Sequence, residues 1–523
     1  MKNGKVIRSA GIVGSFTLLS RGLGMVRDVV FAYFFGTSLM ASAFLVAFKI
    51  PNLFRRLFGE GALSAAFVPV LIEVRTKQSD KEAWEMASKV VTMAFIVLSA
   101  IAIVGVLLFS VALHLPGLSE KWMANFSLSR IMFPYVLFIC MAALCMAILN
   151  SYRHFSTSAF APCLLNLILI ASMLVFPLVG NDPANRAHLL AGAVLLAGVA
   201  QIAIQIPALK RFGCPFRFSS HWDDPHIRQI LLLMGPAALG AGITQINVLI
   251  DGYLAVWVGD WAPAALFYSE RLVYFPLGII ATAMATVLLP TFSVHAAEDD
   301  QDSFGETLTH SLKYLIFIMV PASLGLLVLS SPIIQTVFEW GGSFNTESTL
   351  LSARALCFYA PGLVVFSAAK IFVPAFYAMQ DTKTPVRIGL LAVLLNLTMN
   401  IAFILTLPTY WKHAGMALST VLAGAVNVTI LGIILARRVK NIQWLEILRT
   451  FIRSLFTALV MAIAAWAATQ FLSPILEGLL PSKVAQLAVV ALSISLGALV
   501  YLSLAGMLRS PELHEIKTAI RRR

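Results

Sequence analysis

Seven basic residues lie inside long apolar segments of this 523-residue chain, where a bilayer-spanning helix normally excludes charge. They are Arg21, Arg27, Lys49, Arg55, Arg56, Arg271 and Lys370. Each would cost about 2.5–3.5 kcal/mol at the centre of a membrane helix, so charges retained there usually serve a function. Arginine binds phosphate through a planar fork of N–H donors and stays charged at physiological pH. The arginines therefore predict a site for an anion, and a phosphate or pyrophosphate suits them better than a carboxylate or a cation.

Three acidic residues accompany these bases in the same segments: Asp28, Glu60 and Glu270. Arg56 and Glu60 are four residues apart, so they share one helix face and can pair. In the three segments that hold these acids, six bases outnumber three acids. This surplus favours a water-filled cationic cavity over purely structural pairing. For any single base, snorkelling to the membrane surface or a structural ion pair remains an open alternative.

The composition requires lipid as the solvent for most of the chain. Hydrophobic residues make up 59% and charged residues only 12%, and the mean hydropathy is +0.86. Soluble domains carry about 25% charged residues, so soluble, disordered and fibrous classes are excluded. The net charge of +13 is explained by lysine and arginine in cytoplasmic loops, without nucleic acid as a partner. The basic start resembles a signal peptide but lacks a small-residue cleavage site, so we expect a retained first helix.

Fourteen segments are long and apolar enough to cross a bilayer. They lie near 10–36, 42–73, 86–113, 128–150, 158–180, 187–209, 228–258, 262–293, 308–331, 350–378, 384–407, 412–436, 450–471 and 484–507. The connections are short and hold turn residues, as in Gly180–Pro183 and Gly341–Ser343. Of the 38 lysines and arginines, 25 fall in segments that a cytoplasmic N-terminus places inside and six in segments that it places outside. This asymmetry predicts that both termini are cytoplasmic.

A weak internal repeat with an offset of a little over 220 residues divides the chain. The offset relates Asp28 to Asp251, Gly36 to Gly259, Pro69 to Pro290 and Leu165–Leu167 to Leu395–Leu397. Repeated halves around a central site are typical of transporters. We therefore predict an all-α polytopic membrane protein with two six-helix lobes around a central cavity, plus two C-terminal helices. The predicted boundaries are 1–220 for the N-lobe, 221–440 for the C-lobe, and 441–523 for the last two helices with a cytoplasmic tail.

Two long motifs near the N-terminus resemble those of a known family. The segment Arg21–Asp28, followed by Pro51–Ala62 and Ala66–Pro69, is similar to the MurJ (MviN) family of the multidrug/oligosaccharidyl-lipid/polysaccharide exporter superfamily. Two later segments, Phe267–Leu272 and Gln380–Pro385, also resemble patterns of this family. The resemblance covers essentially the whole chain, including its length and the fourteen predicted spans.

The resemblance implies a bacterial inner-membrane flippase that moves lipid II, the undecaprenyl-pyrophosphate-linked peptidoglycan precursor, from the cytoplasmic to the periplasmic leaflet. It implies that Arg21, Arg27 and Arg271 line a central cavity and are needed for function. The matching motifs add five substrate-site candidates: Asp28, Arg55, Arg56, Glu60 and Glu270. The last two helices would form a groove for the polyprenyl tail. We expect a transporter rather than an enzyme, no cofactor, and lipid II, membrane lipids and candidate cell-wall synthesis proteins as partners.

Two departures from the family pattern concern gating and ion coupling. Ser42 stands where many members carry an acid, which puts any gating pair that uses this acid in doubt. Some members bind sodium in the second half, and the matching positions are Asp251, Asn396, Asn400 and Thr420. Asn400 replaces a carboxylate there, so the sodium site is weakened or absent. For both asparagines, hydrogen bonding between helices is the preferred role, and the coupling ion, sodium or proton, stays open.

Three other functions remain as alternatives. A cation-coupled antiporter for drugs or small solutes would need an acidic, aromatic-lined cavity, which the arginine surplus disfavours. A membrane enzyme acting on lipid-linked sugars would need acids or histidines in a catalytic layout, and the chain has no nucleotide-binding or hydrolase motif. A scaffold for cell-wall synthesis would have no use for charge inside the membrane. The sequence favours a flippase that works by alternating access, with the pyrophosphate held by the arginines.

Overall fold

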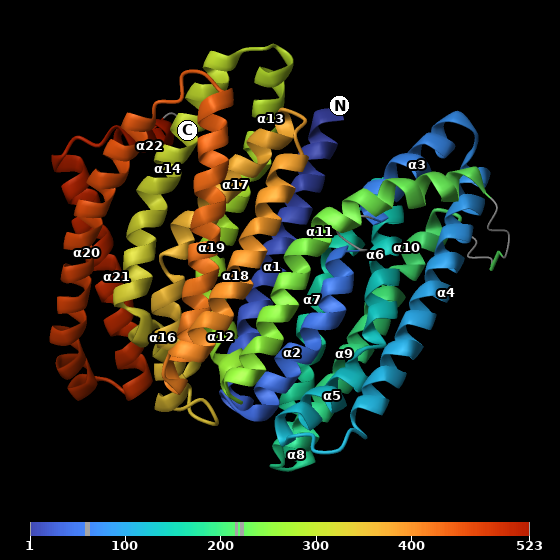
Figure 1. Cartoon of the computed structure of the whole chain (residues 1–523), viewed down its shortest axis with the longest axis horizontal. Helices are drawn as coiled ribbons and strands as arrows, with labels where there is room; N and C mark the ends of the chain where they lie inside the picture. Colours follow the sequence, from blue (N-terminus) through green and yellow to red (C-terminus); the bar gives the residue numbers. More distant parts are fainter. Residues whose placement is uncertain (1, 58–62, 215–217, 220–223, 522–523) are drawn as a thin grey trace. The chain divides into compact units, whose positions relative to one another are not determined.

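The computed structural model describes residues 2–57, 63–214, 218–219 and 224–521. Throughout these residues the chain is helical, with no strand beyond one isolated bridge (Figure 1). It separates into two compact units, Met1–Pro263 and Ala264–Arg523. The all-α class is confirmed. The lobe boundaries at 220 and 440 come from the sequence repeat and stay predictions.

The helices of the first unit are α1 Lys2–Phe35, α2 Leu39–Phe54, α3 Leu63–Lys77, α4 Asp80–Ala112, α5 Glu120–Met132, α6 Tyr135–Ser151, α7 Ser156–Leu174, α8 Phe176–Val179, α9 Pro183–Ala203, α10 Ile206–Arg211 and α11 Pro225–Val258. Those that follow are α12 Ala262–Pro276, the π-helical segment η2 Leu277–Ala281, α13 Thr282–Ala297, α14 Gln301–Val328, α15 Ser330–Phe338, α16 Thr346–Tyr359, α17 Gly362–Ala378, α18 Lys383–Thr406, α19 Thr409–Arg438, α20 Trp444–Leu479, α21 Ser482–Met507 and α22 Pro511–Arg521.

Where the structure describes them, the fourteen predicted spans each fall on one helix or on consecutive helical segments, and the eighth covers α12, η2 and α13. Within the described residues, nine helices or continuous helical stretches are long and apolar enough to cross a membrane, and two bent pairs raise this number to eleven. The chain is therefore a multi-pass membrane protein, and the count of fourteen crossings stays a prediction. The short α15 and the amphipathic α22 were not among the predicted spans.

Proline explains the two bent helix pairs. The α5–α6 pair bends by 41° around Pro134, and the α16–α17 pair bends by 46° around Pro361. Proline lacks an N–H donor and its ring clashes with the preceding turn, so a helix kinks where it occurs. These pairs are the fourth and tenth predicted spans, which the sequence repeat equates. The two halves thus share a bend as well as a sequence echo.

Short side chains begin the helices at the predicted turns. Asp182 accepts hydrogen bonds from the backbone N–H groups of Ala184 and Asn185, and so caps α9 directly before Pro183. Gly180 has a φ of 99°, which favours glycine because a side chain would be strained there. Asp300 caps α14 in the same way by accepting a hydrogen bond from the N–H of Ser303.

Contacts between connections agree with an alternating passage of the chain through the membrane. At one end of the first unit, Lys89 lies 2.7 Å from Asp224, and Arg75 donates to the carbonyl of Ser151. At other helix ends in this unit, Lys121 at the start of α5 donates to the carbonyl of Val256 near the end of α11. The first pairs belong to connections predicted inside and the last to connections predicted outside. Which side is cytoplasmic stays a prediction.

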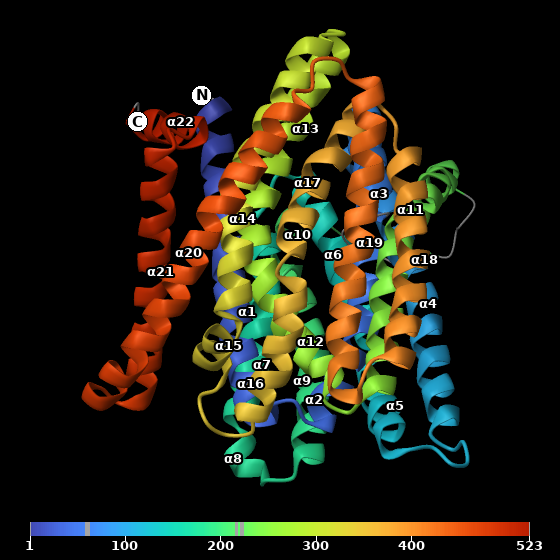
Figure 2. The same ribbon diagram turned by 60° about the vertical axis from the view of Figure 1, so that its left-hand side comes forward.

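The second unit ends in a group of helices that pack along α14. Helices α14 and α20 pack against each other, as do α20 and α21, and α22 contacts both α14 and α21. Figure 2 shows α22 lying across the end of α21 rather than continuing it. Glycine allows one close approach here, because a Cβ on Gly305 of α14 would lie 2.2 Å from the carbonyl oxygen of Lys440.

Candidate functional site

Arg27 and Asp28 of α1 form the best-defined part of the predicted anion site. The Nε and Nη2 atoms of Arg27 lie 2.9 and 2.6 Å from one carboxylate oxygen of Asp28. Nη1 of Arg27 donates to the amide oxygen of Asn166 on α7 at 3.0 Å. The Arg27 side chain keeps 15% of its surface exposed and Asp28 keeps 4%. The guanidinium is therefore held firmly at the edge of the packed interior, where a ligand can still reach it.

Arg55 and Arg56, directly after the end of α2, each donate to an amide oxygen. Arg55 donates through Nε to the amide oxygen of Asn52 at 2.9 Å, one helical turn back. Arg56 is exposed and donates to the amide oxygen of Gln245 on α11 at 3.3 Å. The predicted Arg56–Glu60 pair is not tested, because Glu60 lies outside the described residues. Both arginines belong to the same unit as Arg27.

The segment of α1 around Arg21 is a regular, exposed part of the helix. Arg21 is exposed on α1. Helix α1 continues unbroken through Gly22 and Gly24. A Cβ on Gly22 would meet nothing within 4 Å, and one on Gly24 would lie 3.8 Å from the Asn166 amide. A small side chain would therefore fit at either position, and the glycine at 24 is not required for the approach of Asn166.

Two candidates of the second unit, Arg271 and Glu270, contact aromatic side chains. The guanidinium carbon of Arg271 lies 4.5 Å from the ring centre of Phe267, one turn earlier on α12, which is a cation–π distance. The Glu270 carboxylate accepts a hydrogen bond from the hydroxyl of Tyr359 on α16 at 3.1 Å. Lys370 is exposed on α17. In the first unit, Lys49 is half-buried and packs over Gly252 of α11.

Three of the four predicted sodium ligands, Asn396, Asn400 and Thr420, form a neutral hydrogen-bond network in the second unit. Asn400 donates to the amide oxygen of Asn396 at 3.1 Å, and Asn396 donates to the hydroxyl of Thr420 at 3.2 Å. Ser419, which was not predicted, donates to the amide oxygen of Asn400. These oxygens already accept hydrogen bonds and none of these four side chains is a carboxylate, so the arrangement suits bonding between α18 and α19 better than a cation. Asp251 belongs to the first unit, where Asn247 donates to it at 3.2 Å.

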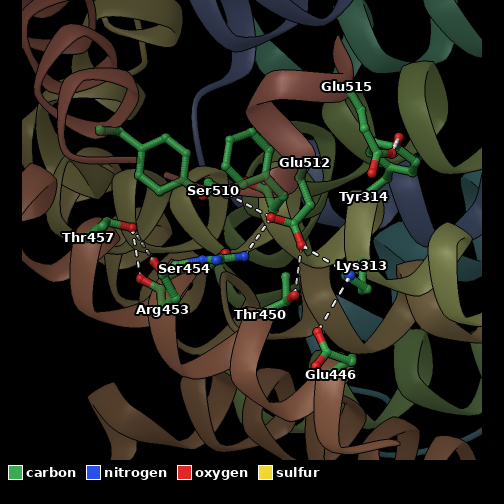
Figure 3. Close-up of polar contacts among 12 residues, drawn as sticks. Lys313, Tyr314, Glu446, Thr450, Arg453, Ser454, Thr457, Ser510, Glu512 and Glu515 are labelled. Atoms are coloured by element: carbon green, nitrogen blue, oxygen red, sulfur yellow. Dashed lines mark hydrogen bonds and ion pairs between the residues drawn. The ribbon is translucent and has the colours of Figure 1, made fainter. Parts of the chain in front are cut away.

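A polar cluster of the second unit was missed by the sequence analysis. Figure 3 shows side chains from α14, α20 and α22 around Glu512, whose side chain is only 2% exposed. Arg453 lies 2.6 Å from its carboxylate, and the hydroxyls of Thr450 and Ser510 donate to it at 2.8 and 2.7 Å. Lys313 lies 3.8 Å away. The polar positions at 450, 453, 454 and 457 share one face of α20, which is the signal that could have revealed the cluster.

The electrostatics of this cluster keep Glu512 charged. Burial raises the pKa of the Glu512 carboxyl, but hydrogen bonds from Ser510 and Thr450 and the positive charge of Arg453 outweigh it. The resulting pKa lies below the usual glutamate value. The cluster thus matches cations with carboxylates and ties α22 to α14 and α20.

An apolar cavity of about 380 Å³ lies between α14, α15, α20 and α21. Its walls include Phe317, Leu326, Met461, Gly497 and Tyr501. The Tyr501 hydroxyl donates to the carbonyl of Phe317 at 2.7 Å, so its polar end is satisfied and its ring faces an apolar space. Such a cavity suits a hydrocarbon chain.

Comparison with known proteins places these features in a family. The family model of the lipid II flippase MurJ matches residues 31–507. The lipid II flippase MurJ of Burkholderia cenocepacia is 34% identical over 482 residues, covering 89% of this chain and 91% of the relative. The probable lipid II flippase MurJ of Rhizobium meliloti is 32% identical over 531 residues, covering 99% and 96%.

Solved structures give the same result for the fold. A lipid II flippase MurJ in an inward closed conformation aligns with a TM-score of 0.75 and 25% identity, covering 95% of this chain and 98% of that chain. An inward-facing multidrug resistance MATE family transporter aligns with a TM-score of 0.66 and 14% identity, covering 82% and 94%. The second similarity concerns the fold alone.

Proposed function

This chain belongs to the family of the lipid II flippase MurJ, and from that premise we infer that it is a lipid II flippase, a transporter rather than an enzyme. The observation that carries this conclusion is the family match over most of a multi-pass helical chain. The antiporter alternative is not favoured, because the similarity to multidrug transporters extends only to the fold.

We propose that the arginines of the first unit bind the pyrophosphate of lipid II. Arg27 has fixed geometry and remains accessible, and Arg55 and Arg56 are hydrogen-bonded to amide oxygens. Guanidinium groups replace the water that a diphosphate loses when it leaves bulk solvent. Arg21 and Arg271 are proposed to serve the same substrate, with Asp28 and Glu270 as neighbours that position arginines. Glu60 stays a candidate from its motif.

The apolar cavity beside the last two helices supports a place for the polyprenyl tail. We propose that the tail occupies the space between α14, α15, α20 and α21 while the headgroup crosses. The protein would open alternately to the cytoplasm and to the periplasm. The membrane potential would act on net charge moved in this cycle.

The proposed location is the bacterial inner membrane, with both termini in the cytoplasm. Membrane lipids surround the chain, and cell-wall synthesis proteins are candidate partners. The coupling ion is open between sodium and proton. The neutral network of Asn396, Asn400 and Ser419 supports little use of sodium at that position.

Replacement of Arg27 or Arg271 by alanine in a flippase-depleted bacterium tests the proposal. We expect both variants to reach the membrane normally and to fail to support growth. A leaflet-accessibility assay should then show lipid II retained in the cytoplasmic leaflet. Normal growth and normal lipid II exposure in both variants would contradict the arginine site.

A binding measurement tests the headgroup separately. The purified protein should bind lipid II more tightly than a neutral prenyl lipid of the same chain length. Equal affinity for the two would remove the role of the pyrophosphate.

A further inference from the structure

Asn166 of α7 is held by two hydrogen bonds that determine the orientation of its amide. Its oxygen accepts from Nη1 of Arg27 at 3.0 Å, and its nitrogen donates to the carbonyl of Ser20 on α1 at 3.1 Å. A guanidinium only donates and a carbonyl only accepts, so the amide has one consistent orientation. Asn166 is 6% exposed, and a buried polar side chain of this kind is costly unless both its groups are used.

These contacts leave part of the Arg27 guanidinium available. Of its five N–H groups, two are directed to Asp28 and one to Asn166. One N–H on Nη1 and one on Nη2 remain to donate to a phosphate. Asn166 contributes no charge, so the local net charge of Arg27 and Asp28 stays at zero rather than becoming negative.

Arg56 shows the same arrangement at a more exposed position. The amide oxygen of Gln245 on α11 accepts its Nη1 at 3.3 Å. The acceptor is again neutral, so this contact leaves the charge of Arg56 unchanged. In both cases a side chain from a different helix fixes the direction of a guanidinium without neutralising it.

We propose that Asn166 and Gln245 are positioning residues for pyrophosphate recognition, each holding a substrate-binding arginine through a neutral amide oxygen that adds no negative charge. The proposal rests on the proposed function, since it assigns the pyrophosphate to these arginines. A carboxylate at either position would hold the arginine at least as firmly but would add one negative charge. An aliphatic side chain would add no charge and would lose the orientation.

Acidic and aliphatic variants at each position separate these two effects. The variants are Asn166→Asp, Asn166→Leu, Gln245→Glu and Gln245→Leu in the purified full chain. The probes are undecaprenyl pyrophosphate and undecaprenol, which share a chain and differ in charge. The readout is the ratio of the two affinities, because a merely structural defect would weaken both lipids alike.

We expect Asn166→Asp to lower the affinity for the pyrophosphate about 30-fold, and Asn166→Leu to lower it about fivefold. Gln245→Glu should lower it about tenfold and Gln245→Leu less than about threefold, because Arg56 is exposed and less constrained. The affinity for undecaprenol should stay within about twofold throughout.

Gln201→Leu provides the matched control. Gln201 on α9 is a buried amide in the same unit that donates to the carbonyl of Ala161 and accepts from the Tyr135 hydroxyl, without touching an arginine. It should leave the ratio of affinities unchanged. A loss in this control as large as that in Asn166→Leu would overturn the proposal, as would a wild-type ratio in Asn166→Asp.

If a variant at Asn166 does not fold, the two variants at Gln245 still test the proposal. Equal effects of Gln245→Glu and Gln245→Leu would then overturn the proposal. The wild-type protein distinguishes failure of the proposed function. If it binds undecaprenyl pyrophosphate no more tightly than undecaprenol, pyrophosphate recognition itself is wrong. If it does discriminate and all four variants match it, only the positioning role is wrong.

Discussion

Arginines in two regions of this protein are held by acceptors of different charge. In the first unit, Arg27 and Arg56 each donate to an amide oxygen from a distant helix, and Arg27 is also paired with the carboxylate of Asp28. At the end of the second unit, Arg453 and Lys313 both lie beside the buried carboxylate of Glu512. The side chains are of the same kind, but the acceptor that comes from another helix is a neutral amide in the first region and a carboxylate in the second.

The difference separates a role in binding from a role in packing. A carboxylate that reaches a cation from another helix offsets its charge and weakens its attraction for an anion, which suits a contact that holds helices together. An amide oxygen fixes the direction of the guanidinium and leaves its charge unchanged. A cation in a membrane protein is therefore a better candidate for anion binding when its acceptor is neutral, and the predictions below test this rule.

The largest effect is expected from Arg27→Lys, which keeps the charge but removes the planar fork. Lysine cannot make the side-on contact with Asp28 and also reach Asn166. We expect lipid II transport to fall by roughly 100-fold, corresponding to about 2.7 kcal/mol of lost recognition. A leaflet-accessibility assay for lipid II, with the variant and the wild type at equal abundance in the membrane, measures this loss of transport. The comparable change Arg453→Lys should leave transport within about threefold, and a large loss there would break the distinction between the two regions.

The next effect concerns the second region and is a loss of stability. Glu512→Gln leaves Arg453 without its carboxylate, and we expect the docking of α22 to weaken by about 2 kcal/mol. This value is below that of a fully buried pair, because Arg453 keeps 26% of its surface exposed. Hydrogen exchange of residues 511–521 should accelerate about 30-fold. Glu515→Gln is the matched control on the same helix, since Glu515 meets the Tyr314 hydroxyl at an exposed position.

Lipid II binding should survive Glu512→Gln. If this variant lowers lipid II affinity as much as Arg27→Lys does, the cluster around Glu512 takes part in recognition, and the assignment of the two regions to different roles is wrong.

The sequence predicted the helices well because length and apolarity alone decide where a chain can cross a membrane. Charge inside those helices also marked the arginines, because each is costly unless used. Partners across long separations were not predictable. Arg27 and Asn166 are 139 residues apart, and nothing in either segment indicates that α7 lies beside α1.

The Leu-Asn-Leu echo illustrates this limit. Asn166 and Asn396 are related by the sequence repeat. The first accepts a hydrogen bond from Arg27, whereas the second donates to Ser419 and Thr420. An amide can donate and accept, so the neighbouring helix decides its role. Glu512 was overlooked for a related reason. A glutamate near a terminus is normally solvated, and its burial follows only from the return of α22 onto α14.

A pH dependence is expected for the second region. The pKa of Glu512 in the folded protein is below its ordinary value, so its contribution to docking is fully present above the unfolded pKa of about 4.3. It is lost as the pH falls through the lower folded value. Exchange protection of residues 511–521 should therefore be constant from about pH 8 to 5 and fall below about pH 4. In Glu512→Gln the decline should be smaller. A decline of equal size in both would assign it to other carboxylates.

The smallest effect is expected where a matched pair is exposed. Arg438 lies 2.5 Å from Asp381, but the arginine side chain keeps 44% of its surface exposed. Solvent screens such a pair, so Arg438→Ala should cost less than about 1 kcal/mol. Asp381 also accepts from the N–H and hydroxyl of Thr384 at 2.9 and 2.6 Å, which holds the start of α18 without Arg438.

Asp381→Ala should therefore lower the stability of the protein more than Arg438→Ala does, because it removes the hydrogen bonds from Thr384 as well as the ion pair. Thermal unfolding and hydrogen exchange of residues 383–390 measure both variants against Glu512→Gln. If Arg438→Ala destabilised its helix end as strongly as Glu512→Gln releases α22, solvent exposure would not govern the strength of these pairs. The small effect expected from the Gln245 variants would then also be in doubt, because it was argued from the solvent exposure of Arg56.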